Sequence, residues 1–128
     1  MKDLAEISSQ LAAQLVISEG SLLQLYRNCS LGESDMDFLL PLSWWNSTNS
    51  KQLRAALEEA NFKNTIVFGE LEHVGYEESW VRNGVKVDLF SSRCSTKTNL
   101  CFLNMWVGSR ASVCSFPFES IRYQRDAC

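Results

Sequence analysis

Three aspartates have the residue type and spacing that suit a divalent metal ion. Asp35 and Asp37 lie two positions apart in a stretch where polar and apolar residues alternate. Since successive side chains of a strand point to opposite faces, both carboxylates are predicted to share one face. Asp88 lies within a second alternating stretch, and the acids converge if the two strands are neighbours. Such carboxylates could hold a divalent ion and leave positions open for substrate oxygens.

The segment upstream of these acids suits a phosphate group. Gly20 and Ser21 are predicted to form a turn that opens a short helix, and backbone N–H groups at a helix start bind phosphate. With the acids, this turn would form a clamp in which the metal ion bridges to phosphate oxygens. Taken alone, each part has a plainer interpretation: the turn as the junction of two helices, Asp88 as a surface residue, and the Asp-x-Asp triplet as a solvated loop.

Hydrophobic patterning predicts the helices that position these residues. A helix is expected over residues 2–18, because leucine and isoleucine recur there at three- and four-residue steps. A second, short helix is expected to begin near Ser21. A third, of about three turns, is expected to follow an N-cap within residues 47–50 and to stop at Asn61.

The chain from Thr65 to Cys114 is predicted to be mostly β-structure. Asn83-Gly84 is a strong hairpin signal, because both positions of a type I′ turn need a positive φ. Glu77 and Glu78 are expected at a solvated strand edge, from which Glu77 could reach the acids. The strands expected over the whole chain cover residues 35–40, 65–68, 76–82, 85–90 and 100–107.

The composition fits one globular domain over residues 1–128, with 45% hydrophobic residues and a net charge of −3. This charge argues against binding nucleic acid through bulk positive charge. The longest mostly apolar stretch is far shorter than the roughly 20 residues of a membrane-spanning helix, so no transmembrane segment is predicted. The first 18 residues do not resemble a signal peptide. His73 is the only histidine, so a hard-metal site must be built from carboxylates.

Five cysteines leave the redox state open. None forms a Cys-x-x-Cys pair, which argues against a zinc finger. Disulfides in an oxidising compartment and buried free thiols are equally good interpretations. One functional hypothesis is therefore a small disulfide-bonded secreted binding module that uses the later four cysteines: Cys94, Cys101, Cys114 and Cys128.

Several segments together resemble the fukutin and LicD family of the nucleotidyltransferase superfamily. The opening Gly20-Ser21-Leu22-Leu23, followed by Arg27 and then by Asp35-Met36-Asp37, is similar to the start of that family's domain. The resemblance covers roughly residues 17–117. Its later parts are Gly75-Tyr76-Glu77-Glu78-Ser79-Trp80, the strand ending in Lys86-Val87-Asp88-Leu89-Phe90, and Cys114-Ser115-Phe116-Pro117.

The resemblance implies an α+β fold with a nucleotidyltransferase-like mixed β-sheet and flanking helices. It also implies a magnesium or manganese ion, Mg²⁺ or Mn²⁺, held by Asp35 and Asp37. Asp88 would be a third metal ligand or the base that deprotonates the acceptor hydroxyl. For contacts to the donor phosphates it points to four residues: Gly20, Ser21, Arg27 and Lys86. Arg27 is an equally good ion-pair partner that stabilises the fold.

The activity implied is transfer of a phospho-alcohol, such as phosphocholine or phosphoribitol, from a CDP-linked donor to a hydroxyl of a glycan or glycoprotein acceptor. The family resemblance also points to the Golgi or secretory lumen. Family domains usually continue past the position where this chain ends. The alternative is therefore an inactive or truncated member that binds a nucleotide-linked donor or a glycosyltransferase partner.

Overall fold

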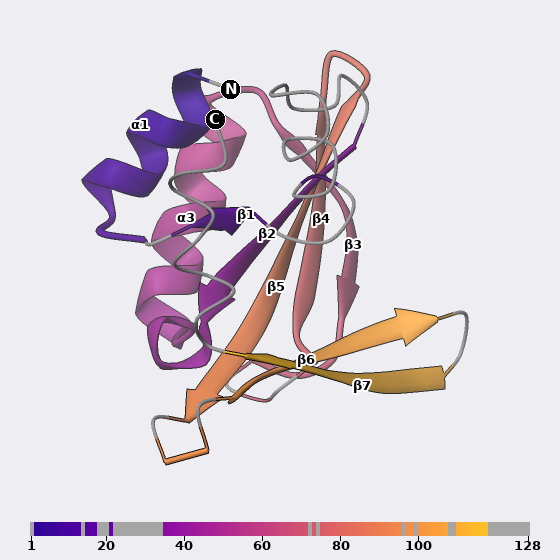
Figure 1. Cartoon of the computed structure of the whole chain (residues 1–128). Helices are drawn as coiled ribbons and strands as arrows, with labels where there is room; N and C mark the ends of the chain where they lie inside the picture. Colours follow the sequence, from indigo (N-terminus) through magenta and orange to yellow (C-terminus); the bar gives the residue numbers. More distant parts are fainter. Residues whose placement is uncertain are drawn as a thin grey trace.

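The computed structural model describes residues 2–13, 15–17, 21, 35–71, 73, 75–95, 97–98, 100–107 and 110–117. In chain order its helices and strands are α1 (Lys2–Gln10), β1 (Val16–Ile17), β2 (Asp35–Pro41), a 3₁₀ helix (Leu42–Trp44), α3 (Ser47–Glu59), β3 (Lys63–Phe68), β4 (Glu77–Arg82), β5 (Val85–Ser95), β6 (Leu100–Val107) and β7 (Arg110–Pro117). The strands form one sheet, and α1 and α3 lie together on one side of it (Figure 1).

The sheet is mixed. Its main path runs β1-β2-β5-β4-β3, with β2 and β5 parallel and the remaining described pairs antiparallel. The long strand β5 pairs with β4 as far as Phe90 and with β6 from Ser92 onward. The β6–β7 hairpin therefore projects from the main sheet on the side away from the helices (Figure 1). These features confirm the predicted α+β fold with a mixed sheet and flanking helices.

The two faces of the central strands differ in chemistry. One face packs on the helices through buried apolar side chains of β2 and β5: Met36, Phe38, Leu40, Val87 and Leu89. These residues share a core cluster with Leu4 of α1 and Leu53 of α3. The opposite face carries the aspartates, followed along the strands by a separate small apolar cluster of Leu39 and Phe90. Strict alternation along β2 and β5 therefore separates the core from the site.

The predicted helix over residues 2–18 is too long. Helix α1 ends at Gln10, where Ala12 adopts a positive φ of 50° and the N–H of Ala13 donates to the carbonyl of Ser8. This is a Schellman ending, which satisfies the last carbonyls of a helix. Val16 and Ile17 instead form β1 and pair with β2. β-Branched residues fit a sheet better than a helix interior, and β2 offers these two a free edge.

Helix α3 confirms its predicted stop. Asn61 has a φ of 64°, its N–H donates to the carbonyl of Glu58, and the N–H of Phe62 donates to the carbonyl of Leu57. The N-cap is Asn46, one residue before the predicted range, and its side chain accepts from the N–H of Asn49 at 2.9 Å. Both helices thus end by the same hydrogen-bond pattern.

The β-hairpin prediction is confirmed, since Asn83 and Gly84 have φ values of 52° and 79° between β4 and β5. Strand β5 continues to Ser95, beyond its predicted end, and β7 was not predicted as a separate strand. The backbones of Cys94 and Cys101 are opposite one another in the β5–β6 pair. Within the described ranges, neither α1 nor α3 is long and apolar enough to cross a bilayer.

Candidate metal centre

The three predicted aspartates converge because their strands are parallel neighbours. Asp37 of β2 is the register partner of Asp88 of β5. One carboxylate oxygen of each of Asp35, Asp37 and Asp88 lies within 4.8 Å of the other two. Asp35 is exposed, Asp37 is half-buried and Asp88 is only 4% exposed. The group therefore runs from solvent into the sheet, with an open side at Asp35.

The described residues do not fully compensate the negative charge of this cluster. Burial raises the pKa of Asp37, and the neighbouring charges of Asp35 and Asp88 raise it further, against hydrogen bonds from Ser21 that lower it. A bound divalent cation would remove this repulsion, because it attracts all three carboxylates at once. Clustered carboxylate oxygens are also the donors that hard cations such as Mg²⁺ and Mn²⁺ prefer. The residues present therefore fit such an ion.

Asp88 is held by two side chains of its own sheet face. The hydroxyl of Ser79 donates to Oδ1 at 2.5 Å, and Nζ of Lys86 donates to Oδ2 at 2.6 Å. Burial lowers the pKa of Lys86, but the hydrogen bond to Asp88 and the charges of Asp88, Asp35 and Glu77 outweigh it and raise the pKa. Lys86, predicted as a phosphate contact, thus lies inside the acidic group and is bonded to Asp88.

Ser21 connects the upstream segment to β2. It is 1% exposed, and its Oγ accepts the backbone N–H of Asp37 at 2.8 Å. The same Oγ lies 3.4 Å from Oδ2 of Asp37 and 3.3 Å from the carbonyl of Asp35, so its single proton can serve one of them at a time. In this structure Ser21 therefore contacts both the backbone and the carboxylate of Asp37. The other predicted phosphate contacts of this segment, Gly20 and Arg27, lie outside the described residues.

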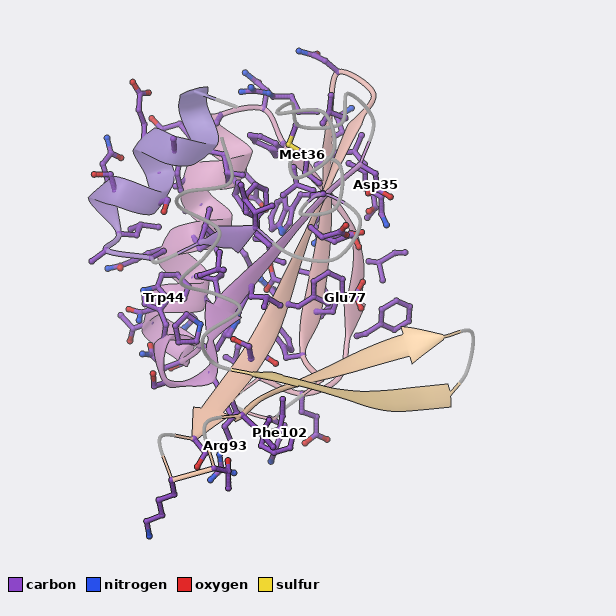
Figure 2. The ribbon with its side chains drawn as sticks, in the orientation of Figure 1. Asp35, Met36, Trp44, Glu77, Arg93 and Phe102 are labelled. Carbon is purple, nitrogen blue, oxygen red and sulfur yellow. The ribbon has the colours of Figure 1, made fainter. Side chains whose placement is uncertain are left out.

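Glu77 and Glu78 are not a solvated strand edge, because they are only 8% and 0% exposed. β4 lies between β3 and β5, so both of its edges are paired. Since Ser79 faces Asp88, Glu77 lies on the acidic face and Glu78 on the helix face. Figure 2 shows Glu77 on the same side of the strands as Asp35, away from the helices. The sequence around Glu77-Glu78-Ser79 carries no polar–apolar alternation, so the face of Glu77 follows only from the pairing of Ser79 with Asp88.

Comparison with known proteins gives a fold but no family. No family model and no curated protein matches the chain. Among solved structures, the aminoglycoside nucleotidyltransferase ANT(2″)-Ia, in complex with adenylyl-2″-tobramycin, matches with a TM-score of 0.50 and 10% identity. The chain has a nucleotidyltransferase-like fold. The match covers 87% of this chain and 51% of the other, so the chain spans about half of that structure's length.

At 10% identity the match shows the fold alone, and no match supports the fukutin and LicD family in particular. Within the nucleotidyltransferase-like fold, the acids occupy the sheet face that the described helices leave uncovered. The structure also has a groove of about 700 Å³ on the other side, between α1, the end of α3 and the β4–β5 turn. Ile7, Ala60 and Arg82 line this groove, which does not reach the aspartates.

Proposed function

We propose that this chain is a metal-dependent transferase that moves a phosphate-linked group from a nucleotide donor to a hydroxyl group. The observation that carries the proposal is the convergence of Asp35, Asp37 and Asp88 on one open sheet face, in a fold shared with a nucleotidyltransferase. Carboxylates that repel one another destabilise the metal-free protein. The same carboxylates can bind a complex of a cation and a phosphate group, which relieves the repulsion.

Asp35, Asp37 and Asp88 would hold the Mg²⁺ or Mn²⁺ ion. When bound, the ion supplies neutralisation of charge on the donor phosphates and polarises the attacked phosphorus. Ser21 keeps Asp37 in place through the backbone bond at 2.8 Å. Lys86, whose ammonium is 2.6 Å from Asp88, would turn its remaining N–H groups toward the phosphate oxygens. Gly20 and Arg27 are proposed as further phosphate contacts from the upstream segment.

The resemblance to the fukutin and LicD family favours a CDP-linked donor and transfer of a phospho-alcohol, phosphoribitol or phosphocholine, to a hydroxyl of a glycan or glycoprotein. In that reaction the hydroxyl oxygen attacks the phosphorus that carries the alcohol, and CMP leaves. The structural neighbour favours a second candidate, because its bound molecule is an adenylylated aminoglycoside. In that case the α-phosphorus of a nucleoside triphosphate is attacked and pyrophosphate leaves.

Calorimetric titration of Mn²⁺, alone and with CDP, tests the proposal directly. We expect wild-type binding that CDP strengthens and that the double substitution Asp35→Asn/Asp37→Asn removes. Chains that bind metal are then incubated with CDP-ribitol, CDP-choline and nucleoside triphosphates, and release of CMP or pyrophosphate decides between the two candidates. Absence of Mn²⁺ binding by the wild-type chain would contradict the metal-dependent function. Binding without turnover on any donor would favour the nucleotide- or partner-binding module.

A further inference from the structure

Glu77 is the one carboxylate of the acidic face that is buried without a partner in the described structure. It is 8% exposed, and no described residue makes a hydrogen bond or ion pair with its side chain. Its register partners are Phe90 on β5 and Phe68 on β3. The carboxylate thus emerges between two aromatic positions, where water compensates its charge poorly.

The carboxylate of Glu77 is nevertheless not fully enclosed. In the described part of the chain, Nε1 of Trp45 is the only fully enclosed side-chain nitrogen or oxygen without a hydrogen bond. The Glu77 oxygens, which have no described partner, therefore each keep some exposed surface, although most of the residue is covered. Because Glu77 is the register partner of Phe90, two positions along β5 from Asp88, a hydroxyl group that approached the aspartates from this side would meet its carboxylate.

The described charged groups that act on Glu77 come from β5, which pairs with β4, and from β2, which lies beyond β5. Asp88 and Lys86 lie on β5 and Asp37 lies on β2. Burial and the charge of Asp88 raise the pKa of Glu77 to about 7, with Asp37 adding to this effect and Lys86 opposing it. A carboxylate in this range takes up a proton more readily than an ordinary one at neutral pH. A bound divalent cation would favour its ionised form, which is the form that accepts a proton.

Asp88 is less suited to that task. Both of its oxygens already accept hydrogen bonds, from Ser79 and from the ammonium of Lys86, and one of them is also within the metal-binding group. Asp35 and Asp37 likewise face the proposed ion. Of the four carboxylates on this face, Glu77 is the one not engaged by a described residue or by the proposed metal site.

We propose that Glu77 is the proton acceptor for the attacking hydroxyl group, while the three aspartates serve the metal ion; this inference rests on the proposed function. The acceptor O–H bond breaks and its proton passes to a carboxylate oxygen of Glu77. The hydroxyl oxygen forms a bond to the donor phosphorus. The bond from that phosphorus to the bridging oxygen breaks, and this oxygen keeps the electron pair and leaves with CMP or pyrophosphate. Glu77 then returns its proton to solvent.

The test compares the wild-type chain with Glu77→Gln, Glu77→Ala and the control Glu59→Gln, which removes an exposed carboxylate of α3. Mn²⁺ and CDP binding are measured by calorimetry, and CMP and pyrophosphate release are measured with CDP-ribitol and CTP, using glycerol as the acceptor alcohol. We expect Glu77→Gln to keep both affinities and to lower kcat about 10²- to 10⁴-fold, the usual contribution of a general base. Glu59→Gln should change neither the two affinities nor kcat.

Chemical rescue separates proton transfer from a merely structural role. Added sodium formate should restore part of the kcat of Glu77→Ala, because formate can occupy the vacated space and accept the proton. If Glu77→Gln misfolds by circular dichroism, Glu77→Asp replaces it and should keep Mn²⁺ affinity while losing kcat. Retained kcat, absence of formate rescue, or loss of Mn²⁺ affinity on substitution would overturn the assignment. Failure of wild-type Mn²⁺ binding would instead contradict the underlying function.

Discussion

Two consecutive glutamates of β4 lie on opposite faces of the same sheet and have opposite surroundings. On the helix face, Glu78 is fully buried and accepts hydrogen bonds from Nε of Arg54 at 2.9 Å, from Nε1 of Trp80 at 3.0 Å and from the hydroxyl of Tyr76. On the acidic face, Glu77 has no hydrogen-bond partner among the described residues. Hydrogen bonds compensate the charge of Glu78, whereas the described residues give Glu77 no hydrogen bond.

The carboxylate of Glu78 contributes hydrogen bonds that stabilise the fold, whereas the carboxylates of the acidic face repel one another. Arg54 of α3 reaches both Glu78 and the hydroxyl of Tyr76, so the network attaches the helix to β4. Among the described residues, the acidic face gathers four carboxylates, and the ammonium of Lys86 is the one positive charge that the structure places beside them. Repulsion of this kind destabilises the metal-free chain, and the proposed metal ion would relieve it.

The largest effect is expected from removing the acids that face the proposed ion. Asp35→Asn/Asp37→Asn should lower Mn²⁺ affinity at least about 1,000-fold, since losing even an outer-shell partner of a metal typically costs 10- to 100-fold. The same variant should melt at a higher temperature than the wild type without metal, because repulsion with Asp88 is relieved. Calorimetry and thermal melts measure both effects. A destabilised variant would mean that the acidic face is compensated after all.

The helix face should respond in the opposite way. Glu78→Ala leaves the buried Nε1 of Trp80 and the hydroxyl of Tyr76 without their acceptor and leaves Arg54 without its counter-ion. We expect the free energy of unfolding to fall by about 2–4 kcal/mol. Mn²⁺ affinity of the remaining folded protein should stay within about threefold of wild type, because the two sites share no partner. Chemical denaturation measures the loss of stability and calorimetry measures the Mn²⁺ affinity. A stability close to that of the wild type, or a larger loss of affinity, would contradict this prediction.

The pH dependence of stability offers a finer contrast between the two faces. In the metal-free chain, burial and Asp88 raise the pKa of Glu77 from 4.5 to about 7, so the folded state holds this proton more tightly than the unfolded state. Its stabilising contribution is present below about pH 4.5 and is lost as the pH rises through about 7. The loss should amount to at most about 3 kcal/mol.

Glu77→Gln should remove most of this dependence between pH 5 and 8, and the raised pKa of Asp37 should leave a smaller decline of the same sign. Melting temperatures of both proteins, recorded across that range without metal, measure the difference. Saturating Mn²⁺ should also flatten the wild-type curve. A decline that Glu77→Gln leaves unchanged would show that Glu77 titrates normally in the folded chain.

Much of the fold and the acidic triad followed from sequence alone because strand alternation is a local property. The spacing of Asp35 and Asp37, the position of Asp88 in the next alternating stretch and the Asn83-Gly84 turn each carry their meaning within a few residues. The sequence predicts that the acids converge only if their two strands are neighbours, and the structure shows that β2 and β5 pair. The proposed roles of the three aspartates remain predictions.

Features that depend on distant neighbours were missed. Val16 and Ile17 fit the end of a helical stripe, and only the free edge of β2 makes them a strand. Glu77 and Glu78 read as solvated, because burial of β4 between β3 and β5 is a property of the whole sheet. In each case tertiary contacts outweighed a correct local pattern.

The smallest effect is expected at Ser21, where the upstream segment meets the acids. Ser21→Ala removes the hydroxyl that accepts the N–H of Asp37 at 2.8 Å and that lies 3.4 Å from its carboxylate. The N–H loses its acceptor and the carboxylate loses a group that restrains it, so Mn²⁺ affinity should fall about 10-fold. Ser50→Ala, at a buried serine of α3 on the helix side, is the matched control and should leave the affinity unchanged. If both variants bind Mn²⁺ like the wild type, Ser21 is a structural contact only; a loss as large as that of the aspartate variant would instead make Ser21 essential to the geometry of the metal centre.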